Sequence, residues 1–140
     1  MYDVILFPTD GSKGAERARD HALKLAADQD ATLHVLHVVE TVAPAASLHE
    51  MIIDRMTEHG QELVESVATL GREQGVTVET AVREGDPAET IVEYSTTKEV
   101  DAIVMPTHGR PELIKAIIGS VTDKVIRTGD VPVIVVKFER

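Results

Sequence analysis

The chain has 140 residues, a formal net charge of -10 at pH 7 and no cysteine. This length fits one domain, and the absence of thiol groups excludes disulfides, thiolate metal sites and a cysteine nucleophile. The acidic surplus repels phosphate backbones at long range, so nucleic acid is not an expected partner. Two explanations of the charge stay open: ordinary solubility, and a halophilic cytoplasm whose salt screens the self-repulsion.

The N-terminus and the apolar runs predict neither a signal peptide nor a membrane span. The N-terminus carries Asp3 and no basic segment, unlike a signal peptide. No apolar run approaches the roughly 18 residues that suggest a membrane span. We therefore expect a single domain over residues 1–140, in the cytoplasm and without a membrane partner.

The first half of the chain alternates between strand-like and helix-like segments. The apolar run Val4–Phe7 is typical of a strand covered on both faces. Small residues at helical spacing follow from Ala15 to Ala26, and Thr32–Val39 is predicted as a second strand. A long helix is predicted over about Leu48–Gln74. Its buried stripe is expected to hold Met51, Ile52, Met56, Leu63, Val67 and Leu70.

The second half continues the alternation. Val76–Val82 is predicted as a third strand, and Asp86 as the cap of a helix with Pro87 in its first position. Ala102–Met105 is predicted as the fourth strand and Val133–Val136 as the fifth. A further helix begins at Ser120, with its inner face expected to hold Val121, Val125 and Ile126.

Five strands separated by helical regions imply a mostly parallel sheet with right-handed crossovers. The order of the strands does not follow from the pattern. Ligands of open parallel sheets bind beyond the carboxyl ends of the strands. That rule selects the segments Pro8–Ser12, Val38–Thr41 and Pro106–Ser120.

The segment Pro106–Ser120 has the features of an anion site. Gly109 allows the backbone to approach a ligand closely, and Gly119-Ser120 precedes a helix whose free amides and dipole favour an anion. His108 and Arg110 could face a phosphate, although no Walker lysine is present. A purely structural interpretation stays open, because Ser120–Asp123 has the spacing of a capping box.

Asp10 directly follows the first strand and has two interpretations. Its carboxylate could accept hydrogen bonds from ribose hydroxyls, or it could cap the helix that begins near Ser12. His34 and His37 lie three apart on a strand, so they point to opposite faces and cannot share a metal ion. No nucleophile elbow and no general base are evident. We therefore expect at most slow hydrolysis of ATP, not an efficient enzyme.

Five segments give the chain a resemblance to the universal stress protein family. They read FPTDGS at 7–12, LHVVE at 36–40, GDPAETI at 85–91, MPTHGR at 105–110 and GSVTDKVIRTGDVPVIVVK at 119–137. Their order and spacing are those of the family over essentially the whole chain. The resemblance implies an α/β fold, an open five-stranded parallel sheet of order 3-2-1-4-5 with helices on both faces. This is a Rossmann-like, adenine-nucleotide-hydrolase-like fold.

Members of this family that bind ATP carry a motif G-x2-G-x9-G-[ST]. Gly109 and Gly119-Ser120 match its later positions, but Pro106 stands where the first glycine is expected. Proline fixes φ and removes an amide donor. ATP binding weakens if that amide or a glycine conformation serves the phosphates, and changes little if the position only lines the pocket.

The resemblance also implies which residues surround ATP or AMP. Pro8, Thr9 and Asp10 would meet adenine and ribose, and the backbone of Val38 would contact the adenine edge. The remaining ligand residues are Met105, Pro106, His108, Gly109, Arg110, Gly119, Ser120, Val121 and Thr122. Magnesium or manganese would accompany ATP, and the strand Val133–Lys137 would pair with a second copy in a homodimer.

Three functions stay open, and these features favour them to different extents. The first is a dimeric stress-response regulator that binds ATP or AMP. The second is a dimeric scaffold or chaperone-like interaction module without nucleotide, which the proline at position 106 favours. The third is an adenylating enzyme of related fold, which needs an SGGxDS-like loop where this chain reads PTDGSKG at 8–14.

Overall fold

Within the described residues, nine elements alternate strictly between strand and helix. The structure is a computed structural model that describes residues 1–40, 46–107 and 119–137. The elements are β1 (Val4–Pro8), α1 (Lys13–Gln29), β2 (Thr32–Val39), α2 (Ala46–Glu73), β3 (Val78–Glu84), α3 (Pro87–Thr97), β4 (Ala102–Pro106), α4 (Ser120–Thr128) and β5 (Val133–Val136). The strands form one parallel sheet of order β3-β2-β1-β4-β5, which confirms the order that the family resemblance implied.

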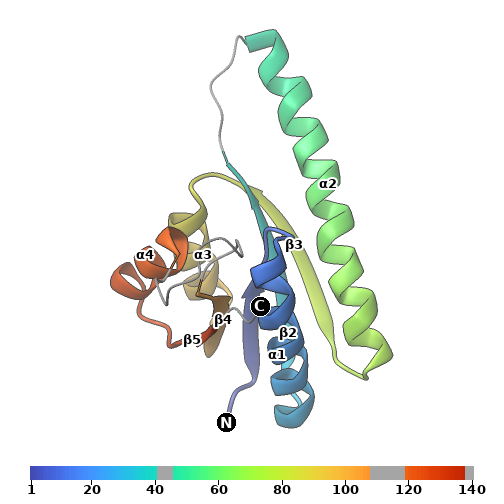
Figure 1. Cartoon of the computed structure of the whole chain (residues 1–140), viewed down its shortest axis with the longest axis vertical. Helices are drawn as coiled ribbons and strands as arrows, with labels where there is room; N and C mark the ends of the chain where they lie inside the picture. Colours follow the sequence, from blue (N-terminus) through green and yellow to red (C-terminus); the bar gives the residue numbers. More distant parts are fainter. Residues whose placement is uncertain (41–45, 108–118, 138–140) are drawn as a thin grey trace.

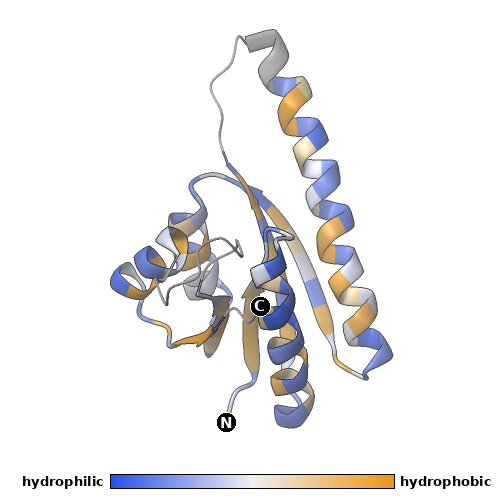
Figure 2. Ribbon diagram, in the orientation of Figure 1, coloured by the Kyte–Doolittle hydropathy of each residue, from blue (hydrophilic) through white to orange (hydrophobic). Residues whose placement is uncertain are grey.

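Helices cover both faces of the sheet, α1 and α2 one face and α3 and α4 the other (Figure 1). Along β1, Ile5 and Phe7 belong to the core beneath α1 and α2, while Leu6 belongs to the core beneath α3 and α4. Burial of both faces explains why β1 and β4 are apolar without interruption. In Figure 2 these strands are largely orange, whereas the helices carry hydrophilic residues on their outer sides.

The predicted start of α3 is confirmed in detail. The carboxylate of Asp86 accepts a hydrogen bond from the Glu89 amide at 3.0 Å, and Pro87 occupies the first helical turn. The cap satisfies one of the free amides at the helix start. Strand β3 begins two residues later than predicted, because Val76 instead closes the end of α2 through its amide and the Gly71 carbonyl.

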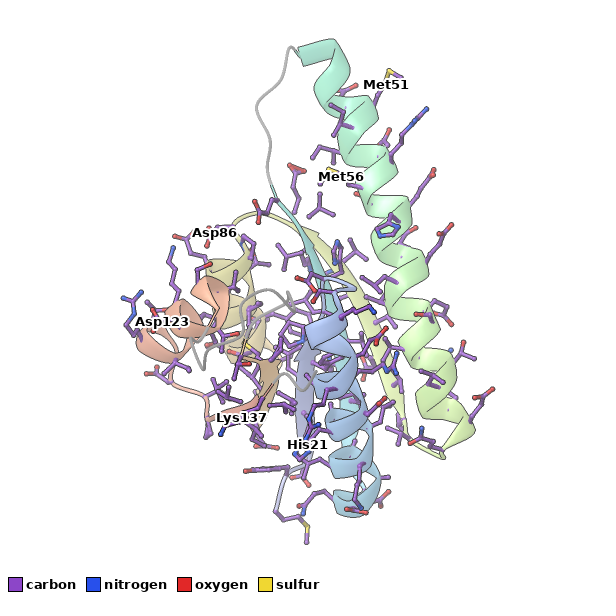
Figure 3. All side chains as sticks on the ribbon, in the orientation of Figure 1. His21, Met51, Met56, Asp86, Asp123 and Lys137 are labelled. Carbon is purple, nitrogen blue, oxygen red and sulfur yellow. The ribbon has the colours of Figure 1, made fainter. Side chains whose placement is uncertain are left out.

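Two predictions about buried helix faces are wrong. Met51 and Ile52 were expected in the buried stripe of α2, but they are 56% and 38% exposed. The first turns of α2 extend past the sheet (Figure 1), and Figure 3 shows Met51 near that far end. The sheet is covered instead by later residues such as Val64 and Val67. Ile126, expected on the inner face of α4, is 41% exposed.

None of the helices within the described ranges combines the length and the apolar composition that a membrane crossing requires.

Candidate functional site

A cavity of about 360 Å³ lies at the carboxyl ends of β1, β2 and β4. In the order β3-β2-β1-β4-β5, the chain winds in opposite directions on either side of β1, so the strand order reverses beside it. This is the place where open α/β sheets bind their ligands. The N-terminal ends of α1, α3 and α4 also contribute residues to the wall.

Every predicted ligand residue that the structure describes lies in the wall of this cavity. They are Pro8, Thr9, Asp10, Val38, Met105, Pro106, Gly119, Ser120, Val121 and Thr122. The other predicted residues, His108, Gly109 and Arg110, lie outside the described residues.

The cavity wall also contains residues that the sequence did not single out. They are Ser12, Ala15, Leu36, Glu40, Pro87 and Ile91. Ser12 and Glu40 lie in the segments selected after the first two strands, so the strand-end rule already pointed to them. Pro87 and Ile91 come from α3, and their approach to the strand ends depends on tertiary packing that no local pattern encodes.

The loop after β1 is fixed to β2 through Thr9. The Thr9 amide donates to the Leu36 carbonyl at 2.8 Å, and Nδ1 of His37 donates to the Thr9 carbonyl at 2.8 Å. Thr9 is buried, so both of its main-chain groups need these partners. The loop therefore enters the cavity wall with a fixed backbone.

The prediction that Asp10 caps the first helix is wrong, because Ser12 is the N-cap of α1 and no side chain caps this helix. Oδ1 of Asp10 accepts a hydrogen bond from the Ser12 amide at 2.9 Å, just before α1 begins. The side chain is nevertheless exposed and lines the cavity. A carboxylate has two oxygens, so the Ser12 amide uses one and the other is able to accept from a ligand hydroxyl.

The hydroxyl of Ser12 is unusual among the described side chains. Its Oγ is buried and has no hydrogen-bond partner. A buried hydroxyl without a partner costs about 1–3 kcal/mol. Because Ser12 belongs to the cavity wall, a ligand with a polar group at this point would recover part of that cost.

The opposite side of the cavity is built from the end of β4 and the start of α4. Pro106 pairs with Val136 of β5, and its carbonyl accepts a hydrogen bond from Oγ1 of Thr122 at 2.9 Å. The Gly119 amide donates to the Thr107 carbonyl. These two bonds hold the N-terminus of α4 against the strand end.

The helix cap at α4 decides between two interpretations of Ser120. Gly119 is the N-cap and no side chain caps the helix, so the capping-box interpretation of Ser120–Asp123 is wrong. Ser120 is exposed in the first turn and lines the cavity. Its hydroxyl and the amides of that turn, together with the helix dipole, favour an anion.

The described wall carries the carboxylates of Asp10 and Glu40 and no lysine or arginine. Within the described parts of the chain, no three histidine or acidic side chains gather to hold a metal ion. Among the described residues, the favourable electrostatics for an anion therefore come from the α4 terminus, while the carboxylates suit hydroxyl or amine donors.

The two histidines of β2 point to opposite faces, as predicted. His37 faces α2, whereas Nδ1 of His34 lies 2.6 Å from the Tyr94 hydroxyl of α3. Burial lowers the pKa of His34, Glu79 opposes this shift and Lys98 adds to it. Burial also raises the pKa of Tyr94. This pair does not line the cavity.

The sheet order and the position of the cavity define an α/β protein of the doubly wound class. The family model described as "Universal stress protein family" matches residues 1–137, and the chain belongs to this family. The universal stress protein MJ0531 of Methanocaldococcus jannaschii is 38% identical over 141 aligned positions, covering 98% of this chain and 83% of the relative.

Solved structures share the fold. The structure of protein MJ0577 superimposes with a TM-score of 0.91 at 30% identity, covering 100% of this chain and 99% of that one. A universal stress protein from Archaeoglobus fulgidus, solved in complex with dAMP, has a TM-score of 0.70 at 23% identity. The alignment covers 96% of this chain and 97% of that one. At this identity the likeness shows the fold alone.

Proposed function

We propose that this protein binds an adenine nucleotide, ATP or AMP, in the cavity and acts as a dimeric regulator in a stress response. The observation that carries the proposal is the pairing of two complementary features in one cavity. The α4 terminus offers an anion site, and the Asp10 carboxylate offers an acceptor for sugar hydroxyls.

The remaining wall suits a flat apolar base. Leu36, Val38 and Ile91 are apolar and line the cavity from β2 and α3. A volume of about 360 Å³ lies within the range of roughly 300–1,000 Å³ that small-molecule pockets occupy. In the proposed arrangement the base lies against these side chains, the ribose at Asp10 and the phosphate at α4.

The dAMP complex of the Archaeoglobus fulgidus protein is compatible with this arrangement. Because that likeness extends only to the fold, the proposal depends on the cavity of this chain. Magnesium or manganese would enter with the phosphates of ATP, since the described side chains offer no preformed metal cluster.

Binding without efficient hydrolysis is the chemistry we expect. The described wall contains no histidine or lysine that could act as a general base. One oxygen of Asp10 already accepts a hydrogen bond from the Ser12 amide. At most slow turnover of ATP follows.

Dimer formation is proposed through β5. This strand pairs with β4 on one side and forms an edge of the sheet on the other. Val133, Ile134 and Val135 are only half-buried in the single chain. An apolar edge of this kind invites strand pairing, and a second copy would provide it. Only a monomer in sizing experiments over a range of salt would contradict this part.

The test combines ligand identification with calorimetry. Mass spectrometry of the purified protein should find retained adenine nucleotide, and titration with AMP and with MgATP should give heat. Gly119→Val should abolish binding, because the added branches crowd the α4 terminus. Thr128→Val, on the exposed far end of α4, is the matched control and should bind normally.

Two results would reject the proposal. One is the absence of heat or thermal shift with millimolar nucleotide, which favours the scaffold or chaperone-like module. The other is unchanged affinity in Gly119→Val, which places the ligand elsewhere.

A further inference from the structure

We infer that His37 is a positioning residue for the ligand cavity. Its ring does not line the cavity. It holds the Thr9 carbonyl and thereby the loop that presents Asp10. The effect on affinity depends on the proposed nucleotide binding, whereas the effect on the loop itself does not.

The hydrogen bond has a fixed direction. Nδ1 of His37 lies 2.8 Å from the Thr9 carbonyl oxygen. A carbonyl can only accept, so Nδ1 carries the proton. Regular pairing of β1 with β2 ends at Pro8 opposite Leu36. The imidazole therefore extends the attachment one residue beyond the last backbone pair.

Without His37 the Thr9 carbonyl would lose this partner. Thr9 is 8% exposed, and a buried acceptor left unpaired is strongly unfavourable. The loop would then move to bring this carbonyl to water. The carboxylate of Asp10 belongs to the next residue, so it would move with it.

Helix α2 fixes the orientation of the imidazole ring. A Cβ added to Gly60 would lie 2.6 Å from Cδ2 of His37 and 3.3 Å from Cγ1 of Val82. Only a residue without a side chain allows α2 to lie this close to the ring. The close approach leaves the ring little room to turn away from Thr9.

The same helix also supports the loop directly. Cδ1 and Cδ2 of Leu63 lie 3.3 Å from the Cβ position of Gly11, whose φ is 77°. The Gly11 amide donates to Oγ1 of Thr9 at 3.2 Å. Thr9 thus joins the loop to β2, with His37 as the side-chain link, while α2 packs against Gly11 and the His37 ring.

The first test compares leucine and asparagine at position 37. Both side chains branch at Cγ and have similar shapes. Only asparagine keeps an N–H donor, and its amide nitrogen is as many bonds from Cα as Nδ1. His37→Leu should weaken AMP binding about tenfold, which corresponds to about 1.4 kcal/mol. His37→Asn should retain most of the affinity.

The matched control is His34→Leu on the same strand. It removes a buried imidazole that bonds Tyr94 on the opposite face and should lower stability without changing AMP affinity. Equal losses of AMP affinity in His34→Leu and His37→Leu would show that His37 contributes only to the stability of the fold and does not position the loop. Wild-type affinity in His37→Leu would reject the inference outright.

A second measurement works without ligand. Amide hydrogen exchange should be faster at Gly11 and Ser12 in His37→Leu than in wild type, while His37→Asn stays close to wild type. Unchanged exchange at these amides would overturn the inference, whether or not the wild type binds nucleotide. Failure of the wild type to bind nucleotide would defeat only the proposed function. If His37→Leu does not fold, Gly60→Ala is the alternative, because it displaces the His37 ring without removing a polar group. It should accelerate hydrogen exchange at the same amides.

Discussion

Replacing Pro106 by glycine restores the residue that the nucleotide motif of the family carries at this position. Alanine at the same site restores only the amide. In the structure Pro106 is the last residue of β4, and the described residues with positive φ lie elsewhere. Its carbonyl is already bonded to Thr122. The position therefore uses no conformation reserved for glycine.

The direction that an amide at position 106 would take also indicates that the proline has little effect on nucleotide binding. The Thr107 amide donates to the Val136 carbonyl of β5 at 3.0 Å. Adjacent residues of a strand direct their N–H groups to opposite sides, so an amide at position 106 would face β1. It would not add to the donors at the start of α4. We expect the affinity for AMP or ATP to change by less than about threefold in either variant, well under 1.4 kcal/mol.

Stability should change more than affinity. Removing proline at a compatible site costs about 0.4–1 kcal/mol by freeing the unfolded chain, and glycine in a strand costs roughly 0.5–1 kcal/mol more. Pro106→Gly should therefore lose about 1–2 kcal/mol, and its melting temperature should fall by about 3–8 °C. Calorimetric titration and thermal melts of both variants provide the data. A tenfold or greater gain in nucleotide affinity in Pro106→Gly alone would show that the phosphates need a glycine conformation. The same gain in both Pro106→Gly and Pro106→Ala would show that they need the amide.

Three further predictions concern stability. Burial lowers the pKa of His34, so the unfolded chain takes up a proton first. The free energy of unfolding should decline as the pH falls below about 6.5. In His34→Gln, the midpoint of urea unfolding should depend less on pH between about pH 7.5 and pH 5 than it does in the wild type. Asp86→Ala removes the cap on the Glu89 amide and should cost about 1 kcal/mol in thermal melts, whereas Asp86→Asn should cost little. Gly71→Ala should destabilise, because its Cβ would lie 2.6 Å from Cγ2 of Val78. Overpacking of about 1–3 kcal/mol outweighs a helix-propensity gain of about 1 kcal/mol, and a higher melting temperature would contradict this balance.

The sequence predicted the strands and the start of α3 because local rules govern them. The uninterrupted apolar run at Val4–Phe7 requires cover on both faces, and Asp86 needs only its own helix to act as a cap. The burial of Met51 and Ile52 was predicted wrongly because helical spacing indicates a face but not how far the sheet beneath it extends.

The cavity was predictable in part for a similar reason. Residues that follow strands, such as Asp10 and Gly119, are brought together by the topology alone. Ile91 reaches the cavity from α3, on the face of the sheet opposite α1 and α2. The support of Thr9 by His37 depends on how closely α2 approaches. Such contacts arise from packing between segments that are distant in the sequence, so no single stretch of sequence predicts them.

The charges around the cavity bear on how the proposed nucleotides would differ. Asp10 and Glu40 make the described wall acidic, and a helix terminus supplies only about half a positive charge. One phosphate held at α4 is compatible with this balance. Each further phosphate adds negative charge that the described wall does not neutralise, and the proposal therefore assigns ATP, unlike AMP, an accompanying cation. The predicted phosphate ligands His108 and Arg110 lie outside the described residues. In the proposed complex the divalent ion would therefore be part of the ligand, bound through its phosphates, rather than a metal resident in the protein.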